Sequence, residues 1–520
     1  MNTSAPVPTR RQAIAMLGIG AGAVLAAGCG GGPSEAADGR VRIAMFNTPR
    51  ASMSPFSDDA FMLTKWSCAE TLVNLDAEGE LVEALASSWE RTDDTTWRFT
   101  VREGVTFHDG SALTAEQAAA CIDFAASHPE APRILDDVEL SVTAEGSEVV
   151  VTTAEPDPLL PQRLSSPSMV ILAEGAYPDA SDGVIDPIGY GTGPFRLTAV
   201  NGTATATLER YEDYWGEAAT ASGIDVSFVP DGTARGSALR TGEADVVEAV
   251  PFSQVANLDE SLLHEIVTPR TLTLYLNTAE GVFTDKGLRA AVRDAIEPTE
   301  LTGTVYEGYA DVAPGLFGPA LTWAEELRSW GTTSFTGAKG AGATDQVPGA
   351  AKAAKVPEGT TITIGTYSDR PELEEVLVVI TAQLERAGFT VTNDVREYEQ
   401  IESDALAGAF DAFLLSRGTV LDSGDPVAYM ESDFSSDGSF SLCFLKDTKV
   451  DAALDKAAAL EAGDERRKAI IAAEEAILAT GAAVPLVNER LLQGEAAGLT
   501  GAERDPYTRA LITASTAVGQ

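Results

Sequence analysis

Histidine, cysteine and basic residues are scarce in this 520-residue sequence, and each shortage excludes a class of function. The three His and four Cys form no CxxC, HxxxH or HExxH spacing, so we expect no zinc or iron site built from protein ligands. Only 36 residues are Lys or Arg against 79 Asp or Glu, which gives a formal charge of −43. A surface that neutralises phosphate must be basic, so this balance excludes nucleic acid as a partner.

Charged residues make up 22% of the chain and hydrophobic residues 44%, which is ordinary for globular proteins. The acidity therefore belongs to a folded chain with a large core and not to a disordered one. At about 100 to 200 residues per domain, the length predicts about three compact units. No GxSxG or other nucleophile motif occurs, so we expect no enzyme activity. A secreted hydrolase is the alternative from the enzyme class, and the missing motifs disfavour it.

Residues 1–28 have the composition of an export signal. Arg10 and Arg11 supply a positive end, Ala13–Ala27 is mildly apolar, and no acid occurs before Glu35. The apolar stretch is too short to remain in a bilayer as a spanning helix. The paired arginines resemble the twin-arginine export motif, so we expect export by that route.

The segment Leu25–Cys29 (LAAGC) resembles a bacterial lipobox. Small residues there allow a signal peptidase to cut before a lipid-bearing cysteine, so the resemblance implies lipidation of Cys29. Residues 29–39 are small and polar, as a tether requires. We therefore expect the protein to be anchored to the outer face of the cytoplasmic membrane.

The apolar pattern predicts an α/β fold. The expected strands are residues 41–45, 97–101 with a hairpin partner at 105–107, 139–143, 148–152, 361–367, 389–391 and 412–415. The expected helices are residues 115–126 capped by Thr114, a helix from Asp285, 371–388, and a pair within 450–479 broken at Gly463. The strand–helix–strand order over 361–391 predicts parallel pairing. Residues 332–358 are rich in Gly and Ala and predict a loop.

Five segments within residues 41–490 carry a family resemblance. They are Leu81–Gly110, GTGPF at 191–195, YEDYWG at 211–216, ALRTGEADV at 238–246 and the block from Asn277 to Ala295. In this order they resemble the peptide and nickel class of extracellular solute-binding proteins, which serve ABC importers. The resemblance implies a two-lobed periplasmic-binding-protein-like fold of type II, with mixed sheets covered by helices and an interlobe cleft that closes by hinge bending.

The resemblance also implies a division of the chain. We expect a signal peptide at 1–28, a tether at 29–39, lobe I from 40–60, 187–268 and 490–520, an extra domain II at 61–186, and lobe II at 269–489. Within these parts, His108-Asp109-Gly110 is interpreted as a turn, and Tyr214 and Trp215 as structural aromatics. Whether Cys68 and Cys121 form a disulfide stays open.

Arg370 is the first candidate ligand residue. It follows the strand expected to end at Tyr367 and precedes the helix from Pro371, and ligands of α/β sheets bind at such strand ends. A guanidinium beside a helix N-terminus suits a carboxylate. In dipeptide-binding members the similar Arg-Pro holds the ligand's C-terminal carboxylate, whereas the alternative is a surface arginine that caps its neighbourhood. Arg417, just after the strand 412–415, is a further cleft candidate.

Asp422 is the second candidate. The loop Thr419–Pro426 (TVLDSGDP) resembles the W-x-G-D-x-G-D-P loop of peptide-binding members, whose first Asp pairs with the ligand's α-ammonium. Asp422 occupies that position, while Thr419 replaces the Trp and changes the side wall. Nickel-binding members usually lack an acid there, so the residue favours an amino-bearing ligand.

These observations predict a lipid-anchored, monomeric substrate-binding protein of an ABC import system. We expect it to capture short peptides or related amino-bearing solutes without a cofactor and to deliver them to a permease and ATPase complex. The alternative ligand is a nickel or other metal chelate, whose carrier carboxylate Arg370 would hold. A structural envelope protein without a working cleft is the rival class.

Overall fold

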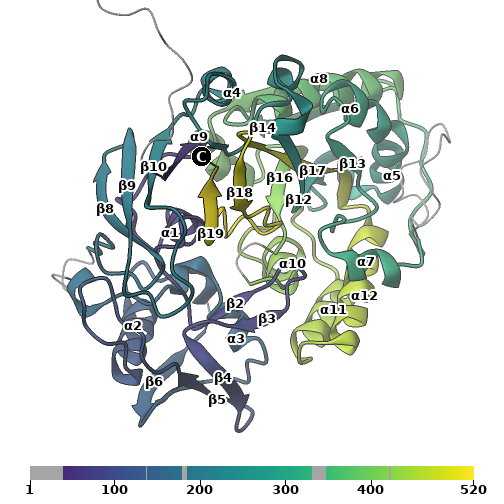
Figure 1. The fold of residues 1–520 in the computed structure, drawn as a ribbon. Coiled ribbons are helices and arrows are strands. Elements are labelled where there is room, and N and C mark those ends of the chain that lie inside the picture. Colours follow the sequence, from purple (N-terminus) through teal and green to yellow (C-terminus); the bar gives the residue numbers. More distant parts are fainter. Residues whose placement is uncertain (1–38, 136–137, 178–183, 331–346, 421–422, 520) are drawn as a thin grey trace, which may run out of the picture. The chain divides into compact units, whose positions relative to one another are not determined.

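The computed structural model describes residues 39–135, 138–177, 184–330, 347–420 and 423–519. Its largest element is a mixed sheet in the order β15-β14-β16-β12-β17-β11-β1-β10-β9-β8, with β13 paired to β17 (Figure 1). The strands of this sheet are β1 (Arg40–Met45), β8 (Phe195–Asn201), β9 (Thr205–Arg210), β10 (Gly223–Phe228), β11 (Val246–Val247), β12 (Leu263–Leu276), β13 (Ala310–Val312), β14 (Thr361–Tyr367), β15 (Thr390–Arg396), β16 (Ala412–Gly418) and β17 (Ala483–Glu495).

Within the described residues, three smaller sheets accompany it. A four-stranded antiparallel sheet has the order β4-β5-β7-β6, and β2-β3 and β18-β19 are two-stranded. Their strands are β2 (Val73–Leu75), β3 (Leu81–Glu83), β4 (Ala86–Arg91), β5 (Thr96–Val101), β6 (Leu140–Glu145), β7 (Glu148–Thr153), β18 (Leu499–Ala502) and β19 (Ile512–Val518).

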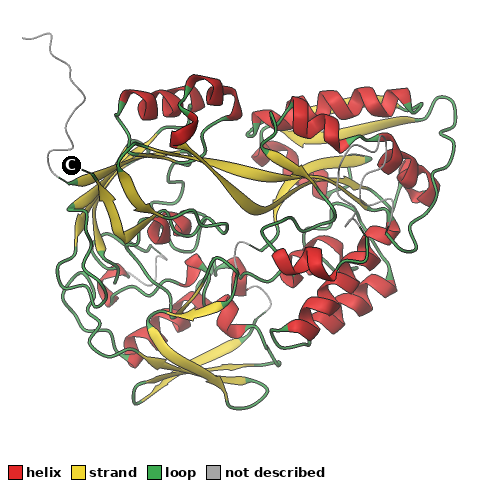
Figure 2. Cartoon of the chain, turned by 45° about the vertical axis from the view of Figure 1, so that its right-hand side comes forward, coloured by secondary structure: helices red, strands yellow, loops and turns green. Residues whose placement is uncertain are grey.

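Helices lie along these sheets, as Figure 2 shows. They are α1 (Ala60–Lys65), α2 (Ala115–Ser127), α3 (Leu160–Arg163), α4 (Gly232–Thr241), α5 (Lys286–Ala295), α6 (Pro298–Thr304), α7 (Thr322–Leu327), α8 (Pro371–Arg386), α9 (Tyr398–Leu406), α10 (Val427–Phe434), α11 (Thr448–Ala458) and α12 (Asp464–Thr480). Helix α8 packs on β14, β15 and β16, and α12 packs on β17. Within the described ranges, no helix is long and apolar enough to cross a membrane.

The predicted strand–helix–strand unit is confirmed. Strands β14 and β15 pair in parallel from Thr361 and Thr390 onward, and α8 connects them. The apolar stripe of α8 is fully buried, with Leu373, Val376 and Ile380 at 0% exposure. The unit is therefore stabilised because the apolar face of α8 is buried against the sheet.

Most other predicted elements are also confirmed. Strands β1, β6, β7 and β16 and helices α2, α5, α11 and α12 lie at or near their expected positions. Thr114 caps α2 as expected, since its side chain accepts the Gln117 N–H. Asp285, predicted as the start of a helix, is the N-cap of α5 and accepts the Gly287 and Leu288 N–H groups. Residues 347–358 contain no helix or strand, and the rest of the predicted loop lies outside the described residues.

The predicted hairpin between residues 97–101 and 105–107 is wrong. Strand β5 instead pairs with β4 and β7. Gly104 has φ +80°, and Phe107 after it is buried in one core cluster with Phe99 and Val101 of β5. Residues 105–107 pair instead with residues 111–113, since Thr106 and Ala112 form an antiparallel bridge and the Phe107 N–H donates to the Ser111 carbonyl at 2.8 Å. Periodicity identified the apolar run but not its partner.

The central strands β12 and β17 are long and antiparallel, and an irregularity interrupts them. Their register shifts between Val267 and Thr271, so Thr268, Pro269 and Arg270 stand at a bulge. Proline suits this place because it has no N–H to donate to a ladder. The bulge brings an arginine to the end of the sheet where β16 finishes, opposite Gly418.

Candidate functional site

Three arginines gather where strands β14, β16 and β12 meet. Strands β14 and β16 are parallel neighbours, so their carboxyl ends lie at one edge of the sheet. Arg370 follows β14, Arg417 lies near the end of β16, and Arg270 pairs in register with Gly418 from the β12 bulge. We call these three residues the arginine group.

Arg370 has the position that the sequence predicted, but its guanidinium is already occupied by acids of the protein. It binds Glu489 at 2.9 Å and Glu372 at 2.6 Å, and it donates to Ser416 Oγ at 2.6 Å. Burial works to lower the pKa of Arg370, but the charges of Glu489 and Glu372 outweigh burial and raise it. Arg370 is therefore a fully charged group with its charge largely neutralised.

Glu489 accepts from three donors of the protein. Its carboxylate accepts hydrogen bonds from Ser416 Oγ at 2.9 Å and from the Tyr306 hydroxyl at 3.2 Å, in addition to Arg370. Its side chain is 4% exposed, so the pairing with Arg370 takes place in a poorly solvated site.

Arg417 is also paired. Its Nη2 donates to Asp433 Oδ1 at 2.9 Å, and its Nε donates to Oδ2 at 3.2 Å. Asp433 is fully buried and receives a further bond from Tyr275 at 3.1 Å. The guanidinium lies 4.6 Å from the Phe440 ring centroid, a cation–π distance.

Arg270 was not among the residues that the sequence predicted for the site. It makes one hydrogen bond, from Nη1 to the Ser416 carbonyl at 3.0 Å, and no described carboxylate lies within ion-pair distance of it. Burial lowers the pKa of Arg270, and the neighbouring charge of Arg370 lowers it further. Proline at 269 was the available signal, since a proline inside a strand marks a bulge.

Asp422 and Cys29, two further predicted residues, lie outside the described part of the chain. The loop beside Asp422 is described on both sides. Thr419 donates from its N–H and its Oγ1 to the Pro269 carbonyl at 2.8 and 3.0 Å. Asp425 accepts the Val427 N–H at 2.9 Å and pairs with Arg466 at 2.7 Å, so its role in this loop is structural.

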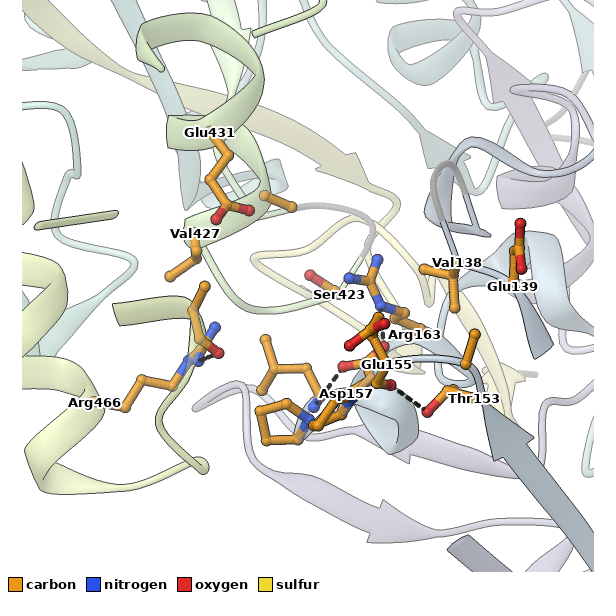
Figure 3. Close-up of a pocket in the computed structure, with 16 residues that line it drawn as sticks. Val138, Glu139, Thr153, Glu155, Asp157, Arg163, Ser423, Val427, Glu431 and Arg466 are labelled. Carbon is orange, nitrogen blue, oxygen red and sulfur yellow. Dashed lines mark hydrogen bonds and ion pairs between the residues drawn. The ribbon is translucent and has the colours of Figure 1, made fainter. Parts of the chain in front are cut away.

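A cavity of about 480 Å³ adjoins the same loop. Ser423, Val427 and Glu431 line it from one side, and residues that include Asp157 and Arg163 line it from the other (Figure 3). Arg163 is paired with Asp157 at 2.7 Å. The Glu431 carboxylate has no hydrogen-bond partner among the described residues, and burial raises its pKa. The cavity thus places polar and apolar surface beside the predicted ligand loop.

The motifs that carried the family resemblance build the fold. Tyr214 and Trp215 donate to the two carboxylate oxygens of Glu70 at 2.9 and 3.0 Å, in accord with a structural role. Gly193 packs so closely that a Cβ there would lie 2.0 Å from the Ser67 carbonyl oxygen. His108 is buried in a turn and contacts the Gly193 carbonyl at 2.8 Å.

The sequence left a disulfide between Cys68 and Cys121 open. Both are free, buried thiols in this structure, as is Cys443. Cys121 Sγ contacts the Tyr177 hydroxyl at 2.9 Å. Across the residues that the structure describes, no group of three or more His, Cys, Asp or Glu side chains is arranged to hold a metal ion.

In sequence, the chain is similar to curated solute-binding proteins. The nickel-binding protein NikA of Staphylococcus aureus is 24% identical over 434 residues, which cover 82% of this chain and 82% of that protein. The glutathione-binding protein GsiB of Salmonella typhimurium is 24% identical over 451 residues, 83% of this chain and 85% of GsiB.

Solved structures show the same fold. NikA from Brucella suis in complex with Fe(III)-EDTA has a TM-score of 0.77 at 20% identity, and the match covers 92% of this chain and 99% of that one. DppA from Helicobacter pylori in complex with the peptide STSA has a TM-score of 0.71 at 19% identity, covering 93% and 98%. The α/β fold is therefore that of periplasmic binding proteins, as the sequence predicted.

The family model of the bacterial extracellular solute-binding proteins, family 5, matches residues 80–441, which is more than half of the chain. Its members are transport proteins that bind solutes outside the cytoplasmic membrane for ABC importers and are not enzymes. This chain belongs to that family and is the substrate-binding protein of an ABC import system.

Proposed function

We propose that this protein captures short peptides or related amino-bearing solutes and delivers them to a membrane permease. The arginine group beside the Thr419–Pro426 loop is the observation that carries the proposal. An arginine site suits a carboxylate and the predicted aspartate of the loop suits an ammonium, so together they match a zwitterion. The peptide STSA, which is bound to the similar DppA of Helicobacter pylori, supports this ligand class.

Solute capture in this proposal uses hinge bending. Lobe I (40–60, 187–268 and 490–520) and lobe II (269–489) close over the solute, and domain II (61–186) flanks them. Closure excludes water, which strengthens each ion pair with the ligand. A micromolar affinity corresponds to about −8 kcal/mol, a value that two such pairs plus backbone hydrogen bonds reach after association costs.

A metal chelate is the second candidate ligand, and the NikA relatives favour it. The described residues offer no cluster of metal ligands, so the metal would have to arrive with an organic carrier. Such carriers are rich in carboxylates, which the arginine group would receive.

Mass spectrometry of the solute that co-purifies with the mature protein separates the two candidates. We expect a short peptide or an amino acid derivative, whereas a metal chelate would replace the peptide proposal. Asp422→Asn should then weaken binding of an amino-bearing solute by at least about tenfold, because it removes a charge-assisted hydrogen bond. Unchanged affinity in Asp422→Asn would contradict the ammonium role.

Lipid anchoring and the twin-arginine route are parts of the same proposal. Cys29→Ser should release the protein from isolated membranes, because the lipid is the proposed attachment. Replacing Arg10 and Arg11 with lysines should block export if the twin-arginine route is used. Continued membrane association of Cys29→Ser would contradict the anchor, and continued export of the lysine variant would contradict the route.

A further inference from the structure

Arg270 has most of its hydrogen-bonding capacity unused. A guanidinium carries five N–H donors. Arg270 uses one of them, on the Ser416 carbonyl at 3.0 Å, and the described residues supply no further acceptor. Among the described residues, the fully buried side-chain nitrogens that lack a partner do not include those of Arg270, so its unused donors face solvent and are open to a ligand.

The neighbouring acids are not available to Arg270. Glu489 already accepts from Arg370, Ser416 and Tyr306, and Asp433 already accepts from Arg417 and Tyr275. Moving either acid would break several hydrogen bonds in a buried site. The nearby charge of Glu489 offsets part of the repulsion that Arg370 and Arg417 exert on Arg270, but Glu489 is not within ion-pair distance of the Arg270 guanidinium.

Arg270 also remains accessible. Its side chain keeps part of its surface exposed, as do Arg370 at 28% and Arg417 at 26%. The exposed parts of Arg370 and Arg417 belong to groups already paired with acids, whereas Arg270 presents donors that lack acceptors. Of the arginine group, Arg270 is the member without a carboxylate partner among the described residues, whereas the charges of Arg370 and Arg417 are matched by Glu489, Glu372 and Asp433.

The backbone around Arg270 is tied to the predicted ligand loop. The carbonyl of Pro269 accepts two hydrogen bonds from Thr419, the first residue of that loop. Thr268 Oγ1 donates to the Glu489 carbonyl at 2.8 Å, which fixes the other side of the bulge. An anion on Arg270 would therefore lie at a rigid position between the central strand and the loop that carries Asp422.

We propose that Arg270, and not Arg370, is the residue that anchors a carboxylate of the transported solute. The inference rests on the proposed function and changes the assignment within it. Arg370 then has a supporting role, in which it holds Glu489 and Ser416 in place. The carboxylate belongs either to the C-terminus of a peptide or to the carrier of a metal chelate, and the test separates these sources.

The test compares free acids with their amides. Probes for the peptide source are Ala-Ala, Ala-Ala-Ala and Ala-Ala-Ala-Ala with a free C-terminus and as C-terminal amides. Probes for the chelate source are Ni²⁺ with L-histidine and Ni²⁺ with L-histidinamide. Affinities are measured by calorimetry on the whole mature protein, on Arg270→Gln, and on Arg270→Lys. Arg196→Gln, which removes an exposed arginine from β8, is the matched charge control.

We expect the wild type to bind the free acids of one probe series more tightly than the corresponding amides. Arg270→Gln should weaken that acid by about 10- to 30-fold and leave the amide unchanged, because it removes a charge-assisted pair with the carboxylate. Arg270→Lys should retain part of the preference, since it keeps the charge and loses the bidentate geometry. Arg196→Gln should bind like the wild type.

Each other outcome overturns the proposal. An acid preference that survives in Arg270→Gln assigns the carboxylate to another residue and leaves the proposed function intact. If the wild type binds acids and amides equally, no residue contacts the carboxylate and the Arg270 assignment is wrong, while the proposal of peptide or chelate binding is retained. If the folded wild type binds neither series, the proposed function fails and the Arg270 assignment fails with it.

Discussion

Glu70 and Arg270 differ in how many hydrogen-bond partners the protein supplies to a charged side chain. Glu70 receives donors on both carboxylate oxygens, from Tyr214 and Trp215. Arg270 offers donors to only one described acceptor, the Ser416 carbonyl. Burial raises the pKa of Glu70 and lowers that of Arg270. Hydrogen bonds from Trp215 and Tyr214 offset part of the effect on Glu70, whereas no described carboxylate forms an ion pair with Arg270.

This difference separates residues that define the fold from residues that can serve a ligand. The side chains of the family motifs around Glu70, Gly193 and Asp245 contact other residues of the protein. Asp245, for example, binds Arg42 at 2.6 Å. A ligand site requires groups whose partners are left for the solute. These motif residues therefore stabilise the fold, while ligand binding in our proposal depends on Arg270 and Asp422.

Breaking a fully compensated pair should give the largest effect. Arg328 and Glu474 are 2% and 0% exposed and pair at 2.7 Å. Arg328→Ala leaves a buried carboxylate without its cation, which typically costs about 3–5 kcal/mol of unfolding free energy. Urea denaturation measures the loss, with exposed Arg386→Ala as the control, since that side chain is 67% exposed. A loss below about 1 kcal/mol would contradict the importance of the pair.

Acid should destabilise the protein through His108. Burial lowers its pKa from 6.5 to about 4, so the folded state binds this proton less readily than the unfolded state. Stability is therefore lost as the pH falls from about 6.5 towards 4, by about 3 kcal/mol in total, since one pKa unit corresponds to about 1.4 kcal/mol. His108→Gln should flatten this part of the pH profile in urea denaturation. An unchanged profile would assign the acid sensitivity to other groups.

Adding a side chain at Gly193 should lower the free energy of unfolding by a smaller amount. An added Cβ would overlap the Ser67 carbonyl oxygen, which is backbone and cannot move independently. Gly193→Ala should cost about 1–3 kcal/mol, the range typical of overpacking. Gly303 in α6 has no atom within 4 Å of an added Cβ, so Gly303→Ala should be neutral or stabilising. Equal thermal midpoints for the two variants would contradict this difference.

Removing the uncompensated charge should have the smallest effect on stability. Arg270→Gln loses one hydrogen bond but also the repulsion from Arg370, so we expect a change within about 0.5 kcal/mol, as for surface substitutions. Urea denaturation without added solute measures it. A loss of more than about 2 kcal/mol would show that Arg270 is part of the structural framework, and the contrast with Glu70 would fail.

The sequence was sufficient where local pattern decides the structure. The α8 stripe, its proline start and Gly388 at φ +106° predicted the parallel unit and placed Arg370 correctly. It was insufficient where distant segments decide. Glu372, which binds Arg370, lies two residues after it, but the other acids come from distant segments: Glu489 of β17 pairs with Arg370 and Asp433 of α10 pairs with Arg417. No spacing near either arginine indicates Glu489 or Asp433. Arg270 was missed for the same reason, since its lack of partners is a property of the assembled sheet.

The three described thiols have a practical consequence for measuring solute-driven motion. Burial raises the pKa of Cys68 to about 12 and also raises the pKa of Cys121 and Cys443, so these thiols are protonated and shielded at neutral pH. Thiolate is the form that reacts with maleimide dyes. In a Cys29→Ser background, two cysteines introduced on exposed positions would therefore be labelled selectively in the native protein. Fluorescence could then test the proposed hinge closure without replacing Cys68, Cys121 or Cys443.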